Sequence, residues 1–224
     1  MRKAIILFTL WLLAGGQAHG LRINGIAPDY TGRTLEFYLL SDPVSRTPLP
    51  LFSVEVGTGG KFSVDTEVTS PVCAFSEFGI FMGRVILEPG KDMTLHFPPL
   101  REKSFEESKN PYFEPVEIWL KTDGENGTGA TNLISRFDTR FYQLTDTYFN
   151  QLYYKQIKSY ADTIGVKLEK EFGKNRDPLL REHIRIRLAS LEADVIRSGR
   201  EKVAGNLKDL PSDAWFRPAF TDFL

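Results

Sequence analysis

Apolar and polar residues alternate along the first part of the chain. Between residues 21 and 100 several short runs carry an apolar residue at every second position, as in Leu35, Phe37 and Leu39. Such alternation is typical of strands that turn one face to a core and the other to solvent. Breaks rich in glycine and proline separate the runs, roughly every ten residues, which predicts an antiparallel β-sandwich or open barrel of about seven strands.

The sequence of one of these breaks predicts the type of turn that it forms. In the segment EPGK, Pro89 presets its φ near −65° at the second turn position, and Gly90 accepts the positive φ required at the third. The segment therefore predicts a type II turn that joins two strands in a hairpin. His96, beyond the turn, falls opposite the apolar Leu95 and Phe97, so we expect it on the surface as part of the scaffold.

Beyond Thr131 the apolar period lengthens to three and four residues, which indicates amphipathic helices. Asp177 and Pro178 form a helix start signal, with a carboxylate at the cap and proline in the first turn. We expect a small bundle, or helices laid along the sandwich. The three predicted apolar stripes are Leu133, Phe137, Phe141, Leu144, Tyr148 and Leu152; Ile157, Tyr160, Ile164, Leu168 and Phe172; and Leu180, Ile184, Leu188, Leu191 and Val195.

The predicted fold class is α+β, an N-terminal antiparallel β-sandwich followed by an all-helical C-terminal domain. Residues 1–20 are assigned to a signal peptide, 21–100 to the sandwich and 131–224 to the helical domain. Residues 101–130 are assigned to a linker with a candidate edge strand at VEIWL. The apolar C-terminus, AWFRPAFTDFL, is expected to pack into the bundle, to bind a partner or to mark a truncated chain.

The N-terminus has the layout of a secretory signal peptide. Arg2 and Lys3 precede an apolar run from Ala4 to Ala14, and small residues follow, with cleavage expected after Ala18 or Gly20. The apolar run of roughly eleven residues is shorter than the ~20 that a membrane-spanning helix needs. We therefore expect an exported protein, periplasmic or extracellular, with no transmembrane segment after signal cleavage.

Composition excludes several classes of chemistry. Without Arg2 and Lys3 the 28 basic residues become 26 against 29 acidic ones, a formal charge of −3, which argues against nucleic-acid binding. A single cysteine, Cys73, and few histidines leave no zinc-binding pattern, and no GxSxG motif is present. We expect no catalytic residues, no metal and no cofactor, although a carboxylate pair for glycan cleavage stays open.

Aromatic residues gather early in the helical part, with seven of them between Phe141 and Tyr160. They cover more than one stripe, so some of them are expected at the surface. One interpretation is packing in the core and at the domain interface. The other is a binding face, which aromatic side chains serve well because they combine a large area with few rotors. The candidate binding face comprises Tyr148, Phe149, Tyr153, Tyr154 and Trp215.

Two segments of the first part carry a family resemblance. INGIAPDYTGRTLEFYLLSD and GGKFSVDTEVTSPVCAFSEFGIFMGRVILEPGKDMTLHF resemble the N-terminal β-sandwich domain of certain secreted bacterial thioredoxin-like proteins. The resemblance covers about 80 residues and implies a sandwich and an envelope location. It implies no redox activity for this chain, because the C-x-x-C motif and the thioredoxin domain that carries it are missing.

These observations lead to one function hypothesis and two alternatives. The leading hypothesis is an exported, non-catalytic protein of the cell envelope that acts as a binding or adaptor module for another envelope protein or a glycan. The first alternative is a carboxylate-dependent hydrolase that acts on envelope glycans or peptides. The second is a truncated relative of a longer envelope protein.

Overall fold

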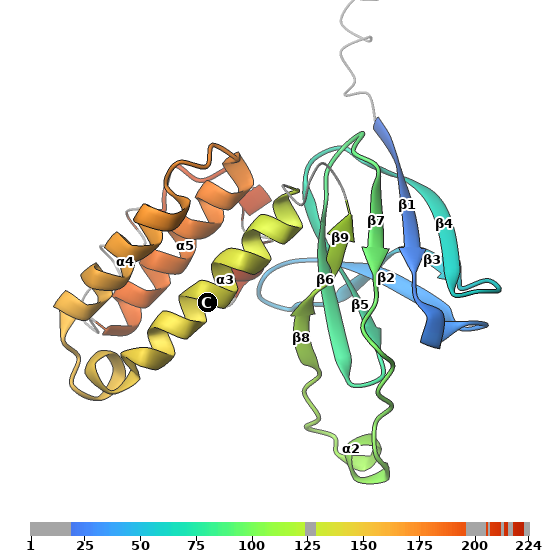
Figure 1. Ribbon diagram of the computed structural model, residues 1–224, viewed down its shortest axis with the longest axis horizontal. Coiled ribbons are helices and arrows are strands. Elements are labelled where there is room, and N and C mark those ends of the chain that lie inside the picture. Colours follow the sequence, from blue (N-terminus) through green and yellow to red (C-terminus); the bar gives the residue numbers. More distant parts are fainter. Residues whose placement is uncertain are drawn as a thin grey trace, which may run out of the picture.

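The structure, a computed structural model, describes residues 19–123, 129–195, 205, 207–211, 213–214 and 217–221. It is a mixed α+β structure with two sheets and several helices, and most of the helices lie to one side of the sheets (Figure 1). Most of the predicted signal peptide lies outside the described residues, as does Trp215.

Nine strands in the described part of the chain form the two sheets. The four-stranded sheet has the order β4 (Lys61–Val68), β1 (His19–Ile26), β7 (Met93–His96) and β9 (Lys121–Asp123). The five-stranded sheet has the order β3 (Pro48–Glu55), β2 (Thr34–Leu40), β5 (Val72–Phe78), β6 (Phe81–Leu87) and β8 (Val116–Trp119).

One apolar core joins the two sheets. Leu21 and Ile23 from β1, Leu35 and Phe37 from β2, and Leu95 from β7 are each almost fully buried in it. The alternation of the sequence therefore corresponds to alternating burial along β2, where Leu35 and Phe37 are buried and Glu36 is exposed. Tyr30, in the short helix η2 (Pro28–Tyr30), closes the core with its ring against Phe78 and Phe97.

The expectation of antiparallel strands in residues 21–100 is wrong at one place, and the candidate edge strand, for which no direction was predicted, is parallel too. β1 pairs in parallel with β7, and β6 pairs in parallel with β8. Alternation along a strand identifies its buried face, but the strand's neighbour and direction depend on segments far away in the sequence. The short helix α2 (Phe105–Lys109) lies between β7 and β8, so helices and strands interleave along the chain.

The segment assigned to a linker supplies a strand to each sheet. β8 lies at VEIWL, at one end of the five-stranded sheet, and β9 lies at one end of the four-stranded sheet. The amide of Asn132 donates to the backbone oxygen of Thr122 and accepts from its backbone N–H, which satisfies the outer edge of β9. β8 receives no strand on its outer side within the described residues.

The predicted turn at EPGK is present, but the strands that it joins, β6 and β7, belong to different sheets, so the predicted hairpin is wrong. The backbone N–H of Lys91 donates to the carbonyl of Glu88 at 3.2 Å, and Gly90 has a φ of 69°. Glycine occupies this conformation without the steric cost that a Cβ would bring.

The helical part contains α3 (Ala130–Thr147), the π-helix η4 (Asn150–Tyr154), α4 (Lys158–Phe172), α5 (Pro178–Val195) and the short α7 (Pro218–Thr221). The Asp177 carboxylate accepts from the Leu180 backbone N–H at 2.9 Å, so it caps α5 as its position predicts. No helix in the described ranges has the length and apolar character needed to cross a membrane.

A second apolar cluster fixes the helices to the five-stranded sheet. The predicted stripes supply most of it, including Phe137 from α3, Ile164 from α4 and Leu180 from α5. Ile86 of β6 belongs to this cluster, whereas its neighbours Val85 and Leu87 belong to the core between the sheets. β6 is therefore buried on both faces, and the helices pack directly on the sheet.

Candidate functional site

A buried polar cluster lies where the helices meet the five-stranded sheet. The Asp138 carboxylate on α3 is 4% exposed and accepts from the Trp119 indole N–H of β8 at 2.9 Å. It also accepts from His183 Nε2 at 2.6 Å and from the Arg187 Nε–H at 3.2 Å, both on α5. A carboxylate only accepts, so the proton of this contact is on His183 Nε2. Three elements thus meet at one carboxylate.

Helix periodicity explains how α5 supplies two partners to Asp138. His183 and Arg187 are four residues apart, so they lie on the same face of α5 one turn from each other. Asp138 follows Ile134 by one turn and shares its buried side of α3. Trp119, at the end of β8, presents its ring to this side and belongs to the apolar cluster of the helices.

The electrostatics of the cluster keep Asp138 ionised. Burial by itself raises the pKa of the carboxyl group, but the charges of His183 and Arg187 and the hydrogen bonds to His183 and Trp119 outweigh it and lower the pKa below its ordinary value. An acid of low pKa with its oxygens occupied by donors is a poor source of protons near neutral pH. Asp138 therefore serves as an anionic anchor for its three partners.

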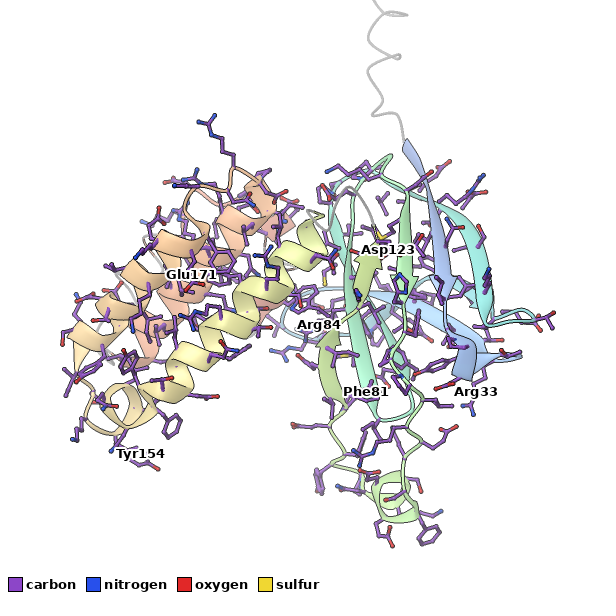
Figure 2. The ribbon with its side chains drawn as sticks, viewed as in Figure 1. Arg33, Phe81, Arg84, Asp123, Tyr154 and Glu171 are labelled. Atoms are coloured by element: carbon purple, nitrogen blue, oxygen red, sulfur yellow. The ribbon has the colours of Figure 1, made fainter. Side chains whose placement is uncertain are left out.

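A pocket of about 380 Å³ opens beside the cluster, and we name it the junction pocket. Its base contains two ion pairs: Arg84 with Glu117 at 2.6 Å, and Arg187 with Asp138. The Arg187 guanidinium lies 5.6 Å from the centre of the Tyr142 ring, a cation–π contact. Arg84 lies between α3 and the sheet (Figure 2). The pocket is lined by Arg84, Glu117, Ile118, Trp119, Ser135, Asp138, Thr139, Tyr142 and Arg187.

The structure brings three of the five candidate binding residues together. Phe149 contacts Tyr153 and Tyr154, with ring centres 5.0 and 5.8 Å apart. Phe149 is 48% exposed and Tyr154 is 76% exposed. We name these three rings the aromatic tip, because they lie at the end of the helical part that is farthest from the sheets, where Figure 2 labels Tyr154.

The other two candidates do not join the aromatic tip. Tyr148 is half-buried, with its ring 5.2 Å from that of Tyr160 and its hydroxyl accepting from Lys167 Nζ at 2.7 Å. It therefore acts in the packing of α3 against α4. Trp215 lies outside the described residues, so its place relative to the tip is a prediction only.

A π-helix exposes the aromatic tip. In η4 the Lys155 backbone N–H bonds to the carbonyl of Asn150, five residues back, so the turn holds one residue more than an α-helical turn. Leu152 is fully buried and anchors this wide turn in the helical core. Its neighbours Tyr153 and Tyr154 then emerge beside Phe149. Gln156 ends the turn with a φ of 53°, a left-handed conformation unusual for a residue other than glycine.

Two other residues whose side chains could have carried chemistry, His96 and Cys73, have structural roles. His96 is half-buried, with 29% of its side chain exposed, and contacts Asp123 of β9 at 2.5 Å. Cys73, the single cysteine of the chain, is half-buried beneath the helices. No group of three or more histidine, cysteine or acidic residues in the described part of the chain has an arrangement that could hold a metal ion.

Sequence reasoning did not identify the residues of the buried polar cluster. Asp138 interrupts an apolar helix face, directly after Phe137, and that interruption was a usable signal. His183 and Arg187 repeat at helical spacing between apolar residues, which is a weaker signal. The partnership of these residues with Trp119 of β8 had no signal in the sequence, because it depends on how α3 and α5 dock on the sheet.

Comparison of the chain with protein-family models, with curated proteins and with solved structures finds no match. The resemblance to the N-terminal domain of secreted thioredoxin-like proteins therefore stays a prediction. The functional argument accordingly depends on the geometry of the aromatic tip and of the junction pocket.

Proposed function

We propose that this chain is an exported, non-catalytic protein of the cell envelope that acts as a binding or adaptor module. The aromatic tip is its partner-binding surface, and the partner is another envelope protein. The observation that carries the proposal is the exposure of Phe149 and Tyr154 in mutual ring contact, with Phe149 at the start of a π-helix and Tyr154 at its end. π-Helical turns are rare and are often found at functional sites.

The physical basis is the cost of leaving aromatic area in water. Tyrosine and phenylalanine rings each bury a large apolar surface on association, and their few rotors lose little entropy. Aromatic side chains are accordingly enriched among the residues that dominate binding energy at interfaces. The rings of the tip contact one another before any partner is bound, which reduces the ordering that binding requires.

The proposal of export depends on the predicted signal peptide. Of the two predicted cleavage positions, the one after Ala18 agrees better with β1, because His19 pairs with Val68 and Gly20 pairs with Glu67 of β4. Cleavage after Gly20 would remove two residues of an ordered strand. The mature chain of the proposal therefore starts at His19.

The proposal also includes a finer architecture. The shared core between the two sheets supports a β-sandwich, and the second cluster of α3, α4 and α5 supports an all-helical domain after Gly129. In this proposal the sandwich is a rigid base. The helical domain of α3, α4 and α5 holds the aromatic tip away from it (Figure 1).

A hydrolase is the second candidate, because Glu117 and Asp138 line the same pocket. Glycan cleavage usually requires two carboxyl groups, one of which is protonated at the start of the reaction. The lowered pKa of Asp138 and its three donors disfavour that role. Glu117→Gln tests this candidate: loss of a muralytic or peptidase activity present in the wild-type chain would favour the hydrolase.

A paired affinity experiment tests the aromatic tip. The mature chain and the variant Phe149→Ser/Tyr154→Ser are each immobilised, and envelope extract is passed over both. We expect one defined partner on the wild-type chain and at least tenfold less of it on the variant, because two interface rings are worth about 1.4 kcal/mol or more together.

The matched control is Phe105→Ser/Tyr112→Ser. These two aromatic residues are 74% and 87% exposed but lie on the α2 segment, away from the helical tip. The control should retain the partner fully. Equal loss in both variants, or no defined partner on the wild-type chain at micromolar concentration, would contradict the proposal.

A further inference from the structure

The outer edge of β8 carries backbone groups that have no strand partner among the described residues. The N–H of Val116 bonds to the Ile80 carbonyl at 2.8 Å, and the N–H of Leu120 bonds to the Arg84 carbonyl at 2.9 Å. Successive residues of a strand direct their backbone groups to opposite sides, so those of Glu117 and Trp119 point away from β6. Among the described strands β8 pairs with β6 alone, which leaves these groups without a strand partner.

The junction pocket follows this edge. It is lined by the three consecutive residues Glu117, Ile118 and Trp119. The side chains of consecutive strand residues alternate between the two faces of a sheet, so a pocket that touches all three runs along the strand's edge. On the opposite wall are Ser135, Thr139 and Tyr142, which repeat along one side of α3. Figure 1 shows α3 leaving the side of β8 at an angle.

The charges of the junction pocket select a neutral occupant. Its two arginines face its two carboxylates: Arg84 pairs with Glu117, and Arg187 pairs with Asp138. The formal charges cancel, so the pocket has no net attraction for a polyanion or a polycation. An extended peptide backbone complements it, because it is uncharged and presents alternating N–H and C=O groups at the spacing of β8.

We propose that the junction pocket binds an extended peptide segment of a partner protein, which adds to β8 as a sixth strand of the five-stranded sheet. The segment has about four residues, the length of β8. Its backbone pairs with Glu117 and Trp119, and an aliphatic or aromatic side chain packs on Tyr142, which is 48% exposed.

The position of α3 beside the junction pocket favours a peptide over a second copy of this chain as the partner that pairs with β8. Edge-to-edge pairing of two sheets requires open space beside the outer strand for the partner's remaining strands. Here α3 supplies residues of the opposite wall of the pocket, and the indole of Trp119 on β8 is bonded to Asp138 on α3. The occupant that we propose is therefore a single extended segment and not a second sheet.

Proline at position 117 tests the strand pairing directly. The Glu117 N–H faces outward, so Glu117→Pro removes a donor of the free edge and leaves the β6–β8 ladder intact. Glu117→Ala is the matched control, because it removes the same carboxylate and keeps the N–H. Circular dichroism and thermal unfolding establish that both variants are folded.

The probe is a phage-displayed library of random heptapeptides, panned on the full mature chain. We expect selected peptides that bind the Ala variant within about threefold of wild type and the Pro variant about tenfold or more weakly, because a desolvated partner group is left unpaired. Hydrogen exchange of the bound complex should show protection of the Trp119 amide.

The proposal would be overturned if no peptide were enriched above background, if the Pro and Ala variants bound equally, or if protection lay outside β8. Binding of N-acetylglucosamine oligomers in the pocket in place of any peptide would also overturn it. The Phe149→Ser/Tyr154→Ser variant should bind the selected peptides like wild type, so the pocket and the aromatic tip succeed or fail separately.

Discussion

At the scale of single residues, Asp138 is the side chain whose removal should lower the free energy of unfolding most. It is buried and accepts from an indole on β8 and from an imidazole and a guanidinium on α5. Asp138→Asn keeps the shape of the side chain but removes the buried negative charge that pairs with Arg187. We expect a loss of about 3–5 kcal/mol in the free energy of unfolding, measured by urea denaturation at pH 7. Asp146→Asn, an exposed change on the same helix, should stay within about 0.5 kcal/mol.

The same carboxylate should give stability a dependence on pH. Because folding lowers the pKa of Asp138, its contribution is complete above the pKa of the unfolded chain, about 3.9, and is lost as pH falls through the lower folded value. The stability difference between wild type and Asp138→Asn should therefore stay constant above about pH 5 and shrink below about pH 4. A difference that instead grows on acidification would contradict the pairing described for Asp138.

Tyr30 should tolerate loss of its hydroxyl. Its side chain is 1% exposed, and its buried hydroxyl has no hydrogen-bond partner among the described residues. Burial is the main cause that raises the pKa of this phenol to about 12. Tyr30→Phe retains the ring contacts with Phe78 and Phe97, so we expect a change between zero and about 2 kcal/mol of added stability in urea denaturation. Destabilisation by more than about 1 kcal/mol would show a partner for the hydroxyl.

At the scale of elements, the turn before β4 depends on a close approach of two backbones. Gly60 has a φ of 70°, and a Cβ there would lie 2.2 Å from the Cα of Pro28. Gly60→Ala should cost at least about 2 kcal/mol, from left-handed strain together with the backbone clash. Gly59, with a φ of 79° and open space around it, gives the control: Gly59→Ala should cost only about 1–2 kcal/mol. Equal losses of unfolding free energy in the two variants, measured by chemical denaturation, would exclude a contribution from the backbone clash.

The helices and strands also show which features can be predicted from the spacing of apolar residues in the sequence. The apolar stripes of α3, α4 and α5 and the cap at Asp177 follow from local sequence, because helix burial repeats within the same segment. The π-helix at Asn150–Tyr154 was not predictable, since its five-residue bond pattern results from burying Leu152 while the chain turns toward α4. β6 offered a signal that alternation missed: Val85, Ile86 and Leu87 form an unbroken apolar run, typical of a strand covered on both faces.

At the scale of the whole molecule, Trp119 connects the five-stranded sheet with the helices. Trp119→Phe keeps an aromatic ring but removes the N–H donor to Asp138. We expect a loss of about 1–3 kcal/mol in unfolding free energy, because a buried acceptor is left short of a donor. By hydrogen exchange, amides in α3 and α5 should lose more protection than amides in β1 and β4.

The double variant Trp119→Phe/Asp138→Asn separates direct coupling from general damage. Once Asp138 is neutralised, the indole N–H has less charge to stabilise. The double variant should therefore lose less unfolding free energy than the two single variants together, by about 0.5 kcal/mol or more. Strict additivity would show that the two side chains do not act together. The same set of proteins can be measured in one series of urea titrations.

The sequence by itself determined the strands with one buried face, the turn at Gly90, the three helical stripes and the absence of a recognisable catalytic motif. These properties are local, because a strand or helix records its buried side in its own period. The tertiary structure alone decided the parallel pairings of β1 with β7 and β6 with β8, the meeting of Trp119, Asp138, His183 and Arg187, and the pocket beside β8. Each of these joins segments distant in sequence, and their contact energies depend on docking geometry that no single segment encodes.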